Sequence, residues 1–484
     1  MDLAFDSALE LATRIRRRKI GCAELLEHYL DRVCRLNGDI NAVCAFDIET
    51  ARKRARAADK AVAKGAALGP LHGVPMTVKE SFDVTGLPTT WGKPDMKRNV
   101  ATRNAVAVDR LLAAGANVFG KTNVPVMLAD WQTFNPLYGT TNNPWDHSRV
   151  PGGSSGGAAA ALAAGLTGLE IGSDIGASIR DPAHFCGVYG HKPTYEICSG
   201  EGHRLPPFVT GNDISVIGPL ARSAADLEVA LTAIVGTSGD DAAGVRVELP
   251  RPARRPWRQW RVAVLRNAPT APVDRAVQDR IQAVADFVAS RGAHVDDKAR
   301  PDIPLAEAHR VFIHLLRAAT SRSLSNEVFG KLAKRAAKVD PSATDYESWM
   351  LRGSTLSHRE WLLLNEARHR MAAAWSAFFR EWDVLLCPAA ATTAFPHNQK
   401  GERWERMVTV NGKPQPSTTQ MFWAGYSGMV YLPSTVAPAG LARDGLPVGV
   451  QIIGPKYGDY TTIAFAAMLE REFACFTPPP AYAG

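Results

Sequence analysis

The feature that most limits what this chain can fold into is the irregular segment 135–157. It reads NPLYGTTNNPWDHSRVPGGSSGG, without the apolar spacing of a helix or the alternation of a strand, and an alanine-rich segment at 158–164 then begins a helix. A long irregular segment inside a folded domain is usually either functional or disordered. Its closing glycines can let the backbone approach a ligand, or they can form a flexible linker or a turn in which Ser155 caps the helix. A phosphate-binding loop is not indicated, because the pattern GxxxxGK[ST] is absent.

Short apolar runs alternate with helical patterns on both sides of this segment. Residues 74–79 (VPMTVK) and 117–119 predict strands, and residues 104–114 between them predict a helix. In the second half, 274–290 has the pattern of an amphipathic helix and 449–453 (GVQII) that of a strand. The alternation predicts an α/β fold in which helices cover a sheet.

Two other regions are expected to be mostly helical. The first fifty residues have apolar side chains at helical spacing, and Asn37-Gly38 is predicted to end a helix there. Residues 303–380 are also predicted to be helical and to cover part of a site. The segment 237–258, with its Gly, Asp, Pro and Arg residues, is interpreted as a connector.

Composition excludes several classes of protein. With 484 residues, 46% hydrophobic and 21% charged, the chain is neither a disordered nor a small disulfide-stapled protein, and its seven cysteines lack any CxxC or zinc-finger spacing. The net charge of +8 is concentrated at 14–19 and 251–261, which lack the aromatic interleaving of a nucleic-acid groove, so no nucleic-acid partner is expected. The start of the chain does not resemble a secretory signal, and 150–169 is too weakly apolar for a membrane span. A cytoplasmic protein without a membrane partner is the expectation.

Two features could carry chemistry. Lys79 ends an apolar strand-like run, and apolar surroundings lower the pKa of a lysine until it can act as a base, although a lysine at such a place can also extend to solvent. Ser178 lies in the small-residue run GSDIGASIR, which suits a nucleophile on a tight turn with backbone N–H groups converging on one point. The same run can equally be a structural β-turn in which Asp174 and Arg180 pair.

A base for Ser178 could come from a histidine or from Lys79. His184 and His191 are close to Ser178 in sequence, but neither has an acid at a suggestive spacing, so a Ser-His-Asp triad stays open without being indicated. His147 and His203 are interpreted as loop or packing residues. A serine–lysine pair is the other known solution. No metal site is indicated, because HExxH and paired carboxylates are absent.

Six motifs together resemble the amidase signature family. They are GVPMTVKE (73–80), GKTNVP (120–125), NPLYGTTNNPW (135–145), PGGSSGG (151–157), GSDIGASIRDPAHFCGVYGHKPT (172–194) and GLPVGVQIIG (445–454). Their order and spacing also agree with the family, over nearly the whole chain. The resemblance implies a single amidase domain, 1–484, with a central twisted mixed β-sheet covered by helices. It also implies a signature core at 65–235 that carries the catalytic residues.

The resemblance also assigns roles to the residues of these motifs. Ser178 matches the nucleophile, Ser154 the serine that follows a cis peptide bond after Gly153, and Lys79 the base. No metal or organic cofactor is needed for this chemistry. The remaining matches are the backbone of Ile175, Gly176, Ala177 and Ser178 as oxyanion hole, and Ser155, Asp174 and Arg180 as supporting residues.

Three positions depart from the family pattern. Ala177 stands where glycine is usual, Glu80 replaces an aspartate, and Asp181 follows Arg180 where an apolar residue is commoner. Because of these departures, the family's substrates cannot be carried over to this chain, whereas the match of the triad residues is not affected.

The resemblance implies an amidase that cleaves the carbon–nitrogen bond of a small-molecule amide, with aryl amides, esters or carbamates as further possibilities. The alternatives are the glutaminase component of a tRNA-dependent amidotransferase and a catalytically silent relative. A homodimer is possible. Expected pocket residues are Met127, Leu128, Ala129, Trp131, Tyr138 and Trp423, the two tryptophans being about as plausible as core residues.

Overall fold

The computed structural model describes residues 3–483, and most of its strands join one large sheet. The strands are β1 Val43–Phe46, β2 Pro75–Lys79, β3 Asn117–Thr122, β4 Phe134–Asn135, β5 Gly139–Thr140, β6 Glu170–Asp174, β7 Tyr189–Lys192, β8 Val216–Ala221, β9 Arg261–Val264, β10 His294–Asp296, β11 Val384–Pro388, β12 Met407–Val410, β13 Lys413–Pro416, β14 Ser434–Leu441 and β15 Pro447–Ile453. The large sheet has eight strands in the order β10-β9-β11-β15-β14-β7-β8-β6. Strand β9 runs parallel to β10 and β11, and the other neighbours are antiparallel, so the sheet is mixed as predicted.

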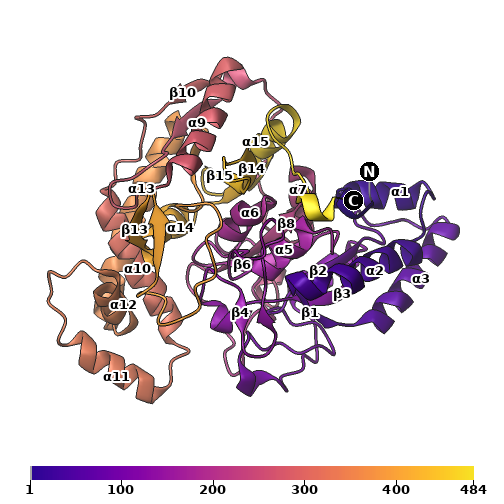
Figure 1. The fold of residues 1–484 in the computed structure, drawn as a ribbon, viewed down its shortest axis with the longest axis horizontal. Coiled ribbons are helices and arrows are strands. Elements are labelled where there is room, and N and C mark those ends of the chain that lie inside the picture. The colour runs from indigo at the N-terminus through magenta and orange to yellow at the C-terminus, as the bar shows by residue number, and fades with distance from the viewer. Residues whose placement is uncertain (1–2, 484) are drawn as a thin grey trace.

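Helices surround this sheet within the single domain (Figure 1). They are α1 Ala8–Arg16, α2 Cys22–Ile40, α3 Ile48–Ala63, α4 Val106–Ala113, α5 Gly156–Ala163, α6 Arg180–Cys186, α7 Ala224–Ile234, α8 Asp241–Gly244, α9 Arg275–Ser290, α10 Leu305–Ser321, α11 Asn326–Ala336, α12 Tyr346–Ser354, α13 His358–Glu381, α14 Met421–Gly428 and α15 Asp459–Glu472. The strands predicted at 74–79, 117–119 and 449–453 correspond to β2, β3 and β15, and the helices predicted at 104–114 and 274–290 to α4 and α9. The predicted α/β fold is therefore confirmed.

The first part of the chain forms a smaller unit beside the large sheet. Strands β1, β3 and β2 make a three-stranded sheet, and β2 runs alongside β6 at the edge of the large one. Helix α2 continues past Asn37-Gly38 to Ile40, so the predicted end was wrong. The Asn37 side chain accepts hydrogen bonds from the amides of Ala42 and Val43, and Asn41 caps the helix in a left-handed conformation (φ 53°).

Helix α5 shows why the alanine-rich segment has no polar face. All eight of its residues are buried, and it packs against α6 and β6 inside the domain. A short helix buried on every side is made of small residues so that neighbouring backbones can approach closely. None of the helices within residues 3–483 is long and apolar enough to cross a membrane.

The helices α10 to α13 form the part of Figure 1 farthest from the N-terminal helices α1 to α3. Helix α10 packs against α12, α13 and α14, and its middle is almost entirely buried. On the other side of the molecule the N-terminal and C-terminal segments lie together, and the rings of Phe5 and Phe476 stack with centroids 6.1 Å apart.

Candidate active site

Lys79 lies at the end of β2 and is completely buried. Its Nζ is 2.7 Å from Ser154 Oγ, 3.0 Å from Ser155 Oγ and 3.0 Å from Ser173 Oγ. Burial lowers the pKa of Lys79 to about 7, although the nearby carboxylate of Asp174 acts in the opposite direction. A substantial share of the Lys79 side chains is therefore neutral near pH 7, and a neutral amine can accept a proton from a hydroxyl.

The glycine–serine run turns out to be the loop that presents Ser154 and Ser155 to this lysine. The Gly153–Ser154 peptide bond is cis. A Cβ at Gly153 would collide with the carbonyl oxygen of Asp130, which explains why glycine is needed there. The loop is an ordered part of the domain, and its residues 151–157 are all buried, so a flexible linker is excluded.

Ser178 lies on the turn that follows β6, and a carboxylate holds this turn together. The Asp174 carboxylate accepts hydrogen bonds from the amides of Ala177 (3.0 Å) and Ile179 (3.1 Å). It also forms a buried ion pair with Arg180 (2.8 Å), so the predicted pairing across the turn is present. Although burial opposes ionisation, this guanidinium keeps the pKa of Asp174 below its usual range.

A backbone hydrogen bond connects the two serine-bearing loops. The amide of Ser155 donates to the carbonyl oxygen of Ser178 (3.1 Å). Both Ser154 and Ser178 line the same cavity, as does Ser173. Ser173 was not singled out from the sequence, although it lies in the same run as Ser178. The sequence signal that could have identified Ser173 as a site residue is its position directly before Asp174.

The turn offers fewer free amides than the resemblance implied. Because the Ala177 N–H already donates to Asp174, the candidate oxyanion donors are the amides of Ile175, Gly176 and Ser178. Ala177 has φ 78°, a left-handed conformation in which an L residue costs about 1–2 kcal/mol relative to glycine. This backbone geometry accounts for glycine being the residue that fits this position best.

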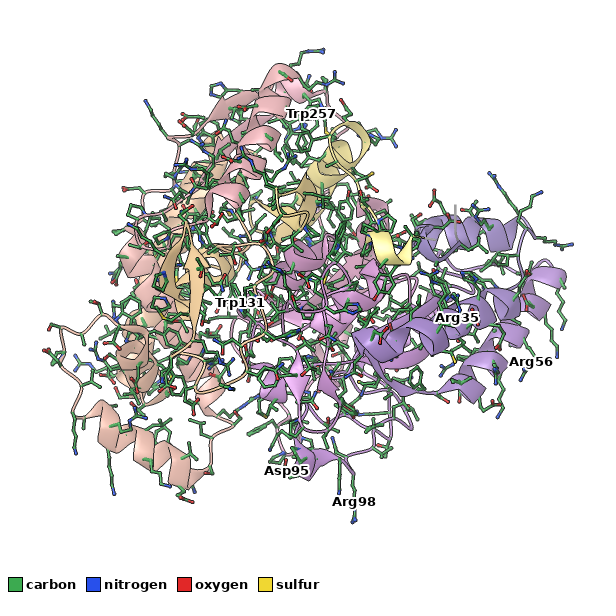
Figure 2. All side chains as sticks on the ribbon, viewed as in Figure 1. Arg35, Arg56, Asp95, Arg98, Trp131 and Trp257 are labelled. Atoms are coloured by element: carbon green, nitrogen blue, oxygen red, sulfur yellow. The ribbon has the colours of Figure 1, made fainter. Side chains whose placement is uncertain are left out.

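The cavity has a volume of about 1740 Å³ and lies between the signature core and the helices α10 and α13. Of the expected pocket residues, Met127, Leu128, Ala129 and Trp131 line it. The indole N–H of Trp131 donates to the carbonyl oxygen of Gly176 (2.7 Å), and Figure 2 shows this side chain at the centre of the molecule.

The expectation for the two other pocket candidates was wrong. Trp423 is fully buried in α14, where its ring packs edge-on against Phe422 at 4.9 Å, and it does not line the cavity. Tyr138 also lies outside the cavity lining, and its hydroxyl donates to Glu80 (3.4 Å). The Trp423 ring belongs to the hydrophobic core of the domain.

The histidines near Ser178 in sequence are engaged elsewhere. His184 bonds to the backbone of Gly449 and Thr392, and His191 bonds to Thr435 and Asp459. Neither lines the cavity. His203 does line it, but it bonds to Ser81 (2.9 Å), and burial lowers its pKa to about 3. Within residues 3–483, the geometry favours Lys79 over a histidine as partner of the serines.

A buried lysine that contacts cavity-lining serines is the arrangement used by serine–lysine enzymes of acyl transfer. A protein-family model described as Amidase matches residues 24–463 of the chain. The chain therefore belongs to the amidase signature family, whose hydrolases act on carbon–nitrogen bonds.

Individual relatives cover nearly the entire chain. An indoleacetamide hydrolase of Bradyrhizobium diazoefficiens is 33% identical over 96% of this chain and 86% of its own length. A glutamyl-tRNA(Gln) amidotransferase component of Anaeromyxobacter sp. (strain K) is 31% identical over 97% of both chains. A solved structure from an inhibitor-bound vestigial protein complex, described with the origins of an s-triazine catabolic enzyme, has a TM-score of 0.81 at 28% identity and covers 97% of this chain and 99% of that one.

Proposed function

We propose that the protein hydrolyses the amide bond of a small-molecule substrate through an acyl-enzyme on Ser178. The observation that carries the proposal is the 2.7 Å contact between Lys79 Nζ and Ser154 Oγ at the edge of the cavity that Ser178 also lines. Neutral Lys79 accepts the proton of Ser154, and Ser154 accepts the proton of Ser178 as its Oγ attacks the amide carbonyl carbon.

The developing negative charge on the carbonyl oxygen needs preorganised donors. The amides of Ile175, Gly176 and Ser178 fill this role in the proposal, because they lie on the turn that Asp174 holds in place. Ser154 then returns the proton to the leaving amine, and the carbon–nitrogen bond breaks. A water molecule releases the acid from Ser178 by the same relay in reverse.

The class of amide is supported by the cavity and by the relatives. Aromatic rings of Trp91, Trp131, Tyr195, Phe208 and Tyr431 line the cavity and suit a substrate with an apolar or aromatic body. The match to an indoleacetamide hydrolase supports the same class. Aryl amides, esters and carbamates share the acyl chemistry and belong in the same screen.

A second candidate is the glutaminase component of a tRNA-dependent amidotransferase. Its support is the series of glutamyl-tRNA(Gln) amidotransferase relatives at 28–31% identity over nearly the whole chain. This function would require partner chains to receive the ammonia, whereas the first candidate would act alone.

The test is a hydrolysis screen of aryl and aliphatic amides, nitroanilides, carbamates and glutamine with wild type and Ser178→Ala in parallel. We expect release by wild type alone, together with labelling of wild type but not Ser178→Ala by a fluorophosphonate. Turnover of glutamine only would favour the amidotransferase function. Equal activity of the two proteins, or no labelling of Ser178, would contradict the proposal.

A further inference from the structure

One buried arginine of the cavity has no carboxylate partner within the described residues. Arg317 lies on α10, is only 7% exposed and lines the cavity. Its Nε has no hydrogen-bond partner, and no acidic side chain within residues 3–483 forms an ion pair with it. The polar side chain beside it is Tyr346, whose ring centroid is 5.6 Å from the guanidinium carbon and whose hydroxyl is also unpaired.

The other buried arginine of this cavity, Arg368, is neutralised by the protein itself, and so is Arg406, whose side chain is 10% exposed. Arg368 pairs with Asp213 at 2.7 Å, and Arg406 pairs with Asp130 at 2.6 Å. Arg403, which donates to the carbonyl oxygen of Ala129, adds a further positive charge to the surroundings of Arg317. Burial and this neighbour both lower the pKa of Arg317, to about 10, so it stays charged at neutral pH.

A buried charge without a partner is strongly unfavourable, so a ligand of opposite charge that pairs with it is bound favourably. Arg317 is placed to meet such a ligand, because it lines the cavity that Ser178 also lines. The preceding residue, Leu316, packs over the Ser178 turn, since a Cβ on Gly176 would lie 4.0 Å from its Cδ2. Arg317 lines the cavity from α10, and Ser178 lines it from the turn after β6.

We propose that the physiological amide carries a carboxylate and that the guanidinium of Arg317, which lines the cavity without an acidic partner among the described residues, binds this carboxylate. The inference rests on the proposed amidase function and specifies its substrate class. A planar carboxylate matches the guanidinium with two parallel hydrogen bonds, which gives orientation as well as affinity.

The test compares amides that differ only in charge. In one arm, monoamides of linear dicarboxylic acids of graded chain length are compared with the matching diamides, which place the charge in the acyl part. In the other arm, N-acylated amino acids are compared with their carboxamides, which place it in the amine part. We expect wild type to prefer the carboxylate partner in at least one arm.

The variant is Arg317→Met, which keeps much of the side-chain volume. Its kcat/KM for the preferred carboxylate amide should fall roughly 10- to 100-fold, while that for the neutral amide stays unchanged, because only the charged group loses a hydrogen-bonded partner. Its melting temperature should stay equal or rise, since an unpaired buried charge is removed. Arg310→Met is the matched control on the same helix. Arg310 pairs with Glu307 at 2.6 Å outside the cavity lining, and its loss should leave both kcat/KM values unchanged.

The possible failures are distinct. If wild type hydrolyses amides through Ser178 but shows no charge preference in either arm, or if Arg317→Met lowers both substrates equally, the carboxylate proposal is wrong and the amidase proposal stands. If wild type and Ser178→Ala are equally inert on every amide, the amidase proposal itself fails. Should Arg317→Met not fold, Arg317→Lys replaces it. That variant retains the charge without the bidentate geometry, and an unchanged charge preference would overturn the assignment of Arg317 as the two-bond partner.

Discussion

Two buried lysines lie on neighbouring strands and differ in what surrounds them. In the β2–β3 ladder, Lys79 is opposite Thr122 and Lys121 is opposite Val78, so the two side chains point to opposite faces of the small sheet. Burial lowers the pKa of both, to about 7 for Lys79 and about 8 for Lys121. A lowered lysine pKa is therefore not enough to identify the base.

The partners of the two lysines separate their roles. Lys121 donates to the carbonyl oxygen of Pro88 and to Thr89, and the carboxylate of Glu80 raises its pKa. Neither Pro88 nor Thr89 lines the cavity. Lys79 instead donates to three serine hydroxyls, and two of them, Ser154 and Ser173, line the cavity. Proton transfer needs both the lowered pKa and a hydroxyl that reaches the substrate.

The strongest test of this comparison replaces each lysine by methionine. Lys79→Met should lower kcat roughly 10²- to 10⁴-fold, because the base is lost. Lys121→Met should leave the rate per folded molecule nearly unchanged and lower the free energy of unfolding by about 1–3 kcal/mol, because the Pro88 carbonyl oxygen loses its donor. Steady-state kinetics and urea denaturation of both variants check this. The reverse pattern would mean that Lys121 is the base.

The serines that contact Lys79 also differ in whether they line the cavity, and we expect this difference to decide their roles. Ser154→Ala should lower kcat by roughly 10²-fold or more, because Ser154 is the hydroxyl through which the proton of Ser178 reaches Lys79. Ser155→Ala should have a smaller effect, because Ser155 does not line the cavity. Single-turnover measurements of acylation and deacylation check this. Equal losses in the two variants would show that contact with Lys79, and not access to the cavity, decides the role.

The pH dependence distinguishes the two lysines without a mutation. Since the neutral form of Lys79 is the active one, kcat/KM should rise with pH up to about 7 and fall about tenfold per unit below it. Lys121→Met should not shift this limb. A limb near pH 8 that disappears in Lys121→Met would contradict the assignment.

The same shift has a defined sign for stability. The pKa of Lys79 is lower in the folded state, about 7, than its ordinary value of 10.5. Between these two pH values the unfolded chain binds more protons at Lys79 than the folded chain does. The contribution of Lys79 to the free energy of unfolding therefore increases as pH rises from about 7 to 10.5, and it is lost as pH falls through this range. Lys79→Met should flatten this part of the stability curve.

The sequence predicted those features that depend on local patterns or on matched motifs. The strands β2 and β15 and the helix α9 follow from apolar spacing, and the contact of Lys79 with Ser154 agrees with what the motif resemblance implied. Features set by long-range packing were not predictable in this way. Helix α14 is buried on all sides, so its sequence contains no signal that turns Trp423 away from the cavity.

Arg317 is the converse case, because it lines the cavity although its sequence pattern did not predict this. An arginine on an amphipathic helix is ordinarily interpreted as solvent-exposed, and only the packing of α10 against α12 and α14 buries it at the cavity. Ser173 was missed for a related reason, since a strand residue reveals its partners only when the neighbouring loop is in place.

The smallest expected effect concerns Asp181, the acid of the Lys79 site that departs from the family pattern. Asp181 is fully buried, and its Oδ2 accepts a hydrogen bond from the Gly153 amide at 3.3 Å. Its Oδ1 has no partner within the described part of the chain. Burial raises the pKa of Asp181 well above its usual range.

Asp181→Asn tests whether burial keeps this side chain protonated at the pH of the reaction. A protonated Asp181 predicts an unchanged acidic limb of the pH–rate profile, because an amide is also neutral and keeps an acceptor for the Gly153 N–H. The profile is measured beside wild type at constant ionic strength. If Asp181 were ionised, its charge would hold up the pKa of Lys79, and the variant would shift the limb to lower pH. Such a shift would mean that Lys79, like Lys121 beside Glu80, works next to a counter-charge, and the contrast between the two lysines would then rest on their hydroxyl partners alone.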